Sequence, residues 1–184
     1  MEHEKDHEIF KAIGRGDGGK VRELIEGPLG KELISSRDHF QMTPFIFSAW
    51  ANRGDLLLYL LEKGSDIDAV DKSGRTALHY VSDNGRKNLV YQLIQKGAST
   101  KIISLNGSNA FINVAEWGYV DAIKMLWNVS DRSATDHYGN SAVMLAALGG
   151  YKDAVVYLVN RGCDSNPNNR GMTLLMCAVW GNNL

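Results

Sequence analysis

The chain has 184 residues, of which 44% are hydrophobic and 22% are charged, and its formal net charge is −1. This is the composition of an ordinary globular protein, and it does not indicate binding to nucleic acid or to an anionic membrane. No apolar stretch approaches the roughly 18 residues of a membrane-spanning helix, and the acidic first residues do not resemble a signal peptide. Cys163 and Cys177 lack the spacing of a disulfide framework, so we expect a reducing compartment, the cytoplasm or alternatively the nucleus.

The N-terminal part of the chain predicts a cap rather than a regular unit. Residues 1–5 are expected to be frayed. Residues 6–37 are predicted to form a divergent capping repeat of two amphipathic helices that separate at Gly16. The segment from Gly14 to Val21 matches glycine-rich phosphate-binding patterns, but those patterns need a preceding strand, which is missing here. We therefore interpret this segment as a turn between two helices.

The segment from Asp71 to Gly97 is the clearest unit in the rest of the chain. It starts with a turn that ends at Gly74, where a glycine can adopt a positive φ. Thr76 can cap a short helix, which stops at Gly85, and a second helix with apolar residues at helical spacing follows. Two helices this short cannot bury an apolar face alone, so neighbouring copies are expected.

Copies of this unit recur every 32 or 33 residues. The predicted repeats are repeat 1 (38–70), repeat 2 (71–103), repeat 3 (104–135), repeat 4 (136–167) and a partial repeat 5 (168–184). We call equivalent positions in successive repeats a slot. The turn slot holds Gln41, Gly74, Gly107, Gly139 and Gly171; the cap slot holds Thr43, Thr76, Asn109, Ser141 and Thr173; the break slot between the helices holds Asn52, Gly85, Gly118, Gly150 and Asn182. Glycine and asparagine suit the left-handed backbone that such a break requires.

These motifs resemble the ankyrin repeat family over nearly the whole chain, most completely at Asp71, Gly74 and Thr76 and at His79 and Gly85. The resemblance implies an all-α solenoid of helix-turn-helix repeats with short β-turn or hairpin fingers. It also implies that His79 hydrogen-bonds to a neighbouring repeat. The positions that it marks as structural are Thr43, Pro44, Gly74, Thr76, His79, Gly85, Gly118, Gly139 and Gly150.

Two repeats depart from this pattern. Repeat 3 has Asn109 in the cap slot and Ser130-Asp131 where the family has glycine and alanine, so its hairpin is expected to be irregular. Trp127 takes a core leucine slot there and is expected to pack between repeats. Repeat 5 stops after its first helix, and we expect the chain to be the N-terminal part of a longer protein whose repeats continue.

Patterns of catalytic and metal-binding residues are incomplete. His3 and His7 are one helical turn apart but have no third ligand. The acidic residues from Asp66 to Asp71 lack the glycine and the distal glutamate of a calcium loop. No nucleophile lies at a recognisable spacing from His79. We therefore predict no enzymatic activity, no cofactor and no bound metal.

A partner-binding surface is the remaining candidate. In ankyrin-like stacks, partners usually bind on a concave face that the fingers and first helices form. The residues predicted for this face are Phe40, Met42, Trp50, Arg75, Asp83, Glu116, Trp117, Tyr138 and Leu148. Large aromatic residues are typical of interface hot spots, and the two acids predict a groove with an acidic centre and aromatic walls. For Trp50 and Trp117, packing beneath the adjacent loop is the alternative interpretation.

The predicted function is a non-catalytic protein–protein interaction module, either a scaffold, an adaptor or a targeting domain. Its partner is a protein or peptide segment, and the chain itself is expected to be monomeric. One alternative is a sensor of nucleotides or small molecules that uses Trp50, Lys72 and Arg75, although Asp83 and Glu116 disfavour an anion there. A passive spacer within a larger protein is the other alternative.

Overall fold

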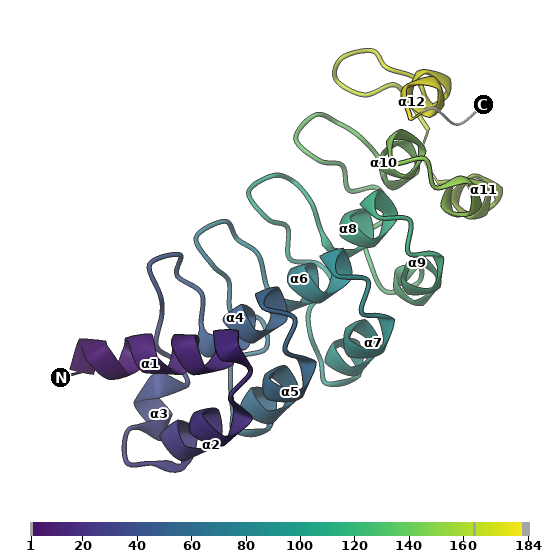
Figure 1. The fold of residues 1–184 in the computed structure, drawn as a ribbon. Coiled ribbons are helices and arrows are strands. Elements are labelled where there is room, and N and C mark those ends of the chain that lie inside the picture. The colour runs from purple at the N-terminus through teal and green to yellow at the C-terminus, as the bar shows by residue number, and fades with distance from the viewer. Residues whose placement is uncertain (1, 164, 182–184) are drawn as a thin grey trace.

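Short helices stack in pairs along one axis, as Figure 1 shows. The structure is a computed structural model that describes residues 2–163 and 165–181, with side chains from residue 8 onward. Within these residues there are twelve helices. Their bounds are α1 Glu2–Arg15, α2 Gly18–Glu26, α3 Gly30–Leu33, α4 Pro44–Trp50, α5 Gly54–Glu62, α6 Ala77–Asp83, α7 Lys87–Gln95, α8 Ala110–Glu116, α9 Val120–Leu126, α10 Ala142–Leu148, α11 Lys152–Asn160 and α12 Leu174–Trp180.

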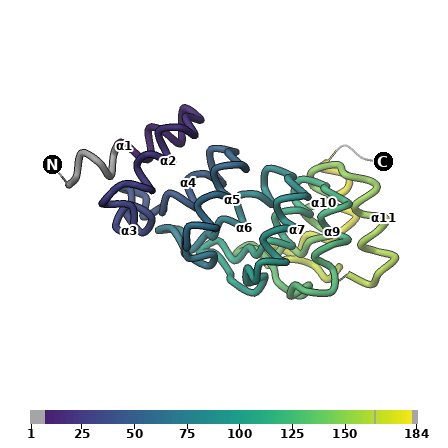
Figure 2. Tube along the Cα trace, turned by 90° about the horizontal axis from the view of Figure 1, so that it is seen from below, coloured from purple at the N-terminus to yellow at the C-terminus, as the bar shows by residue number. Residues whose placement is uncertain are grey.

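The elements form three layers along the stack: finger-like loops, a row of inner helices and a row of outer helices (Figure 1). The inner helices are α4, α6, α8, α10 and α12, and each of the first four packs against the next one in the row. The outer helices are α5, α7, α9 and α11. Figure 2 shows that the pair α1 and α2 lies at one end of an elongated molecule and α11 at the other. The all-α solenoid predicted from the repeats is confirmed.

The N-terminal pair of helices packs on the first regular repeat through the contact of α1 with α4. The helix α1 begins at Glu2, and the fraying expected for residues 1–5 stays a prediction; Met1 lies outside the described residues. Gly16 separates the two helices with a φ of 74°, as predicted. Asp17 then caps α2, since its carboxylate accepts a 2.9 Å hydrogen bond from the backbone N–H of Lys20.

The predicted cap slot precedes each regular inner helix. Thr43, Asn109 and Thr173 each accept a hydrogen bond from the backbone N–H three residues later, at 3.2, 3.0 and 3.3 Å. These bonds satisfy N–H groups that a helix leaves without partners in its first turn. Thr76 instead shares a capping box with His79, and Ser141 occupies the same slot before α10.

The break slot between inner and outer helices has the left-handed backbone that was predicted. The φ values are 58° for Asn52, 63° for Gly85, 66° for Gly118 and 81° for Gly150. A second requirement acts at Gly118, where a Cβ atom would lie 2.2 Å from Cγ of Tyr151 in the next repeat. Asn182, in the same slot of repeat 5, lies outside the described residues.

One continuous core runs between the two helix rows. Trp127 is 5% exposed and packs edge-on between Phe111 of α8 and Tyr157 of α11, with ring centroids 5.9 and 6.1 Å away. The prediction that Trp127 packs between repeats is therefore confirmed. In the part of the chain that the structure describes, no helix combines the length and the apolar character needed to cross a membrane.

Candidate partner-binding face

The five fingers are built alike and are bonded to one another. At the base of most fingers an Asp or Asn side chain accepts hydrogen bonds from the backbone two and four residues later, as Asp71 does from Ser73 and Arg75 at 2.7 and 3.0 Å. Each finger after the first also donates one backbone hydrogen bond to the finger before it. These bonds run from Lys72 to Phe40, Leu105 to Ser73, His137 to Asn106 and Asn169 to Tyr138, at 2.8 to 3.0 Å. The predicted turn fingers thus form a connected row.

The last residues of the inner helices form a second row beside the fingers. This helix-end slot holds Trp50, Asp83, Glu116, Leu148 and Trp180. We call the surface formed by this slot, by Trp117 and by the exposed finger residues the inner face. An ion pair between Arg75, at the base of the second finger, and Asp83, at the end of α6, joins the two parts.

The acid predicted at Asp83 is neutralised within the chain. Its carboxylate pairs with Arg75, whose guanidinium lies 4.2 Å from the ring centre of Tyr80. The Tyr80 hydroxyl in turn donates a 2.6 Å hydrogen bond to Asp71. Burial raises the pKa of Asp83, although the Arg75 charge opposes that rise. Arg75 and Asp83 were both predicted for the partner-binding face, and the structure shows that they form an ion pair with each other.

Glu116 differs from Asp83 because it forms no ion pair or side-chain hydrogen bond with a described residue. Desolvation raises the pKa of its carboxyl, and the nearby charges of Asp83 and Asp136 raise that pKa further, while the charge of Arg75 opposes the rise. Trp117 follows directly as the C-cap of α8 and is 48% exposed. An unpaired acid and a half-exposed indole therefore stand side by side at the middle of the inner face.

The exposure of the aromatic residues resolves the alternatives left open for them. Trp50 is 54% exposed, and its ring leans on Phe47 with centroids 5.2 Å apart. Trp50 and Trp117 are therefore surface residues, not side chains packed beneath loops. Tyr138 is 42% exposed on its finger, and Leu148 is half-buried at the end of α10.

Phe40 and the two cations considered for ligand binding, Lys72 and Arg75, all contact other side chains of the chain. Phe40 is 41% exposed, and the Lys72 ammonium lies 3.9 Å from its ring centre. Lys72 and Arg75 thus already have partners, Phe40 and Asp83. Ser73, Arg75, Leu105, Asn106 and His137 line an open hollow of about 540 Å³ between the fingers. A phosphate there would compete with Asp83 for Arg75.

The prediction that Met42 belongs to the exposed face is wrong. Met42 is 8% exposed and belongs to the core, and its backbone N–H donates to Asp38 at 2.9 Å. The position before each helix cap is generally covered, since Ser108 and Asn140 in the same slot are also buried. Arg75 occupies the same slot but is only partly buried, because its long side chain crosses Tyr80 and reaches Asp83.

His79 has the structural role that the repeat pattern implied. Its Nδ1 accepts a 3.2 Å hydrogen bond from the backbone N–H of Thr76, and its Nε2 lies 3.2 Å from the carbonyl oxygen of Ser108 in the next repeat. Because that carbonyl can only accept, Nε2 carries the proton. Burial lowers the pKa of His79 to about 4, so the ring is neutral at pH 7.

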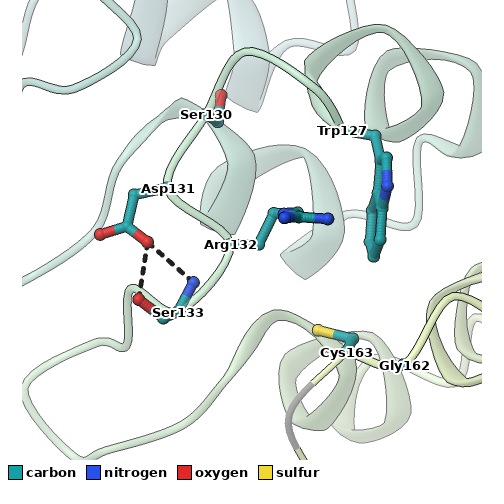
Figure 3. A pocket seen from close by; sticks show the side chains of 7 residues that line it. All are labelled: Trp127, Ser130, Asp131, Arg132, Ser133, Gly162 and Cys163. Carbon is teal, nitrogen blue, oxygen red and sulfur yellow. Dashed lines mark hydrogen bonds between the residues drawn. The ribbon is translucent and has the colours of Figure 1, made fainter.

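A hollow at the end of α9 was missed by the sequence reasoning (Figure 3). It measures about 390 Å³ and is lined by Trp127, Ser130, Asp131, Arg132, Ser133, Gly162 and Cys163. The Arg132 guanidinium lies 4.9 Å from the Trp127 ring, and Asp131 accepts two hydrogen bonds from Ser133. The irregular end of repeat 3 is the signal that could have revealed it. Among the described residues no group of three or more His, Cys, Asp or Glu side chains is placed to hold a metal ion.

Comparison with known proteins identifies related repeats in otherwise diverse proteins. Inversin from Gallus gallus is 33% identical over 89 residues, which are 48% of this chain and 8% of inversin. A palmitoyltransferase from Drosophila melanogaster is 33% identical over 101 residues, 54% of this chain and 15% of that protein. A homologue of the transient receptor potential cation channel subfamily A member 1 from Caenorhabditis elegans is 29% identical over 105 residues, 56% of this chain and 9% of the channel. The chain thus matches only a small part of each relative.

A family comparison gives the broader result. The family described as ankyrin repeats (3 copies) matches residues 48–131 and 111–184, which is well over half of the chain. Ankyrin repeats are generally protein–protein interaction modules and are typically non-catalytic. The paired helices, the connected fingers and the cap and break slots described above agree with this match. The chain belongs to the ankyrin repeat family.

Proposed function

We propose that the chain is a non-catalytic scaffold or adaptor module that binds a segment of a partner protein on its inner face. The observation that supports this most is the exposure of Trp50 and Trp117, at 54% and 48%, at the ends of α4 and α8. Large aromatic side chains gain stability from burial, and tryptophan is enriched at interface hot spots. Two such residues on one side of a repeat stack favour a surface that a partner covers.

The same surface makes a small anionic ligand the weaker candidate. Lys72 already lies over Phe40, and Arg75 already pairs with Asp83, so neither cation is available without breaking an existing contact. Glu116 adds an unpaired negative charge nearby. A protein segment with apolar side chains requires none of these changes.

Affinity capture from cell lysate with quantitative mass spectrometry tests the proposal. The bait is the full 184-residue chain, compared with a Trp50→Ala/Trp117→Ala variant. Tyr91→Ala is the matched control, since Tyr91 is 53% exposed but lies on the outer helix α7. We expect a partner that the wild type and the Tyr91 variant retain and that the double variant loses at least about ten-fold, as for hot-spot residues.

Circular dichroism and thermal melting of each bait first establish that all three are folded. A partner retained equally by every variant would place binding away from the inner face and contradict the proposal. Capture of no partner by the wild type would favour the passive spacer instead.

A further inference from the structure

The helix-end slot gives the inner face a defined order of chemical groups along the stack. Trp50 stands at one side, followed one repeat later by Asp83 and two repeats later by Glu116, with Trp117 next to it. Because α4 packs on α6 and α6 packs on α8, these groups lie on successive neighbouring helices. A bound segment that follows the stack meets them in that order.

The two acids in this row offer different environments to a partner. Asp83 forms an ion pair with Arg75. The pair is neutral overall, so a partner needs no charged residue opposite it. Glu116 forms no ion pair with a described residue, and the charge of Arg75 acts on it only alongside those of the Asp83 and Asp136 carboxylates. An incoming lysine or arginine would therefore meet complementary charge at Glu116 rather than at Asp83.

Trp117 adds a second reason to expect a basic side chain at this position. It follows Glu116 in the chain and is 48% exposed. Lysine and arginine have apolar stems and a cationic head, and the cation is attracted to the face of an indole ring. One basic side chain can pair with the carboxylate while its stem covers the exposed indole.

The helix spacing sets the distance between this basic contact and an apolar contact at Trp50. Packed helices lie about 8–10 Å apart, so two steps along the inner row span roughly 16–20 Å. An extended chain advances about 3.3 Å per residue and covers that span in about five or six residues. A helical segment rises only about 1.5 Å per residue and would need about 11 to 13 residues.

We propose that the inner face recognises an extended partner segment with a lysine or arginine on Glu116 and Trp117 and a large apolar side chain on Trp50, about five or six residues apart. This proposal rests on the proposed function and names the chemistry of the partner at that site. Residues between the two contacts pass over the neutral pair of Arg75 and Asp83 and need no charge.

A displayed library of random peptides of about 16 residues tests both the chemistry and the spacing, because that length holds the extended and the helical spacing alike. The library is selected on the wild-type chain and sequenced. We expect the enriched peptides to share a basic residue about five or six positions from an aromatic or large aliphatic residue. Enrichment of the longer, helical spacing would overturn the extended segment.

Binding of an enriched peptide is then measured by fluorescence polarisation with Glu116→Gln and with Glu62→Gln as the matched control. Glu62 is exposed on the outer helix α5, so its substitution makes the same change in net charge elsewhere. We expect binding to weaken about ten-fold for the Glu116 variant and to stay unchanged for the control. Replacing Glu116 by lysine and the peptide's basic residue by glutamate should restore binding through the reversed pair.

The failures of the two proposals are distinguishable. Peptides that depend on Trp50 and Trp117 but carry no basic residue, or bind equally well to the Glu116→Gln variant, overturn this inference and leave the proposed function intact. A library and a lysate that both yield no ligand dependent on the inner face overturn both proposals.

Discussion

The inner helices α10 and α12 hold the same place in successive repeats but are buried to very different degrees. Val143 and Met144 of α10 are fully buried, whereas Leu175 and Met176 at the same slots of α12 are 65% and 53% exposed. The helix α10 packs against α8, α11 and α12, while α12 packs on α10. In such a stack the burial of an apolar residue is therefore decided by the following helices as much as by its own repeat.

The largest effect expected from this contrast comes from truncating one methionine in each helix. Met144→Ala leaves a cavity in a closed core and should lower the free energy of unfolding by about 2–5 kcal/mol. Met176→Ala removes a half-exposed side chain and should cost less than about 1 kcal/mol. Chemical denaturation of both variants measures the difference. Equal losses would mean that a second copy of the chain covers α12 in solution. The free energy of unfolding would then depend on protein concentration.

The same slot in α6 holds His79, which turns a packing position into a pH-sensitive one. Its folded pKa of about 4 lies below the ordinary value of 6.5, so the unfolded chain binds a proton more readily. Stability from the neutral ring is complete above pH 6.5 and is lost as the pH falls towards 4. At full protonation the loss amounts to about 3 kcal/mol.

Denaturation of the wild type and of His79→Gln across pH 7 to 4 isolates this contribution. The free energy of unfolding should fall more steeply with decreasing pH for the wild type than for the variant. Asp83 and Glu116 have raised pKa values and act in the opposite direction, since the folded state binds their protons more readily. They are present in both proteins, so parallel profiles would contradict the assignment to His79.

Two finger glycines give the smallest and most local comparison. Gly139 and Gly171 share the turn slot, with φ values of 78° and 74°. A Cβ atom on Gly139 would lie 2.6 Å from Oδ1 and 2.9 Å from the backbone nitrogen of Asn169, whereas one on Gly171 meets nothing within 4 Å. Alanine at either position should cost about 1–2 kcal/mol in backbone strain. We expect Gly139→Ala to cost about 1 kcal/mol more, for the displacement of the next finger. Thermal unfolding that shows equal costs would mean that the finger moves aside freely.

The architecture could be predicted because the information is local and repeated. Caps at Thr43 and Asn109, and a left-handed break at Asn52, follow from the chemistry of single residues in a fixed slot. The inter-repeat bond of His79 came from the family pattern rather than from the residue itself. The start of α1 could not be predicted, since the polar residues from Glu2 onward carry no apolar periodicity that marks a helix.

The candidate site was predicted less well because it depends on how side chains reach across the surface. The helix-end slot correctly placed Trp50 and Glu116 on one face, as register alone determines that. Sequence could not show that Arg75 crosses Tyr80 to Asp83, because their separation of eight residues spans a finger base and a whole helix. The exposure of Met42 was predicted wrongly for a related reason. The sequence of a finger does not show whether a given side chain points into the core or towards solvent.

The hydrogen bonds between fingers also give the molecule a set of internal reporters. The amide protons of Lys72, Leu105, His137 and Asn169 are each donated to the finger before it, and each therefore crosses one junction between repeats. An amide exchanges with solvent deuterium only when its bond opens. Exchange at these four positions consequently records how often each of four successive junctions separates, so the cooperativity of the stack can be read one junction at a time.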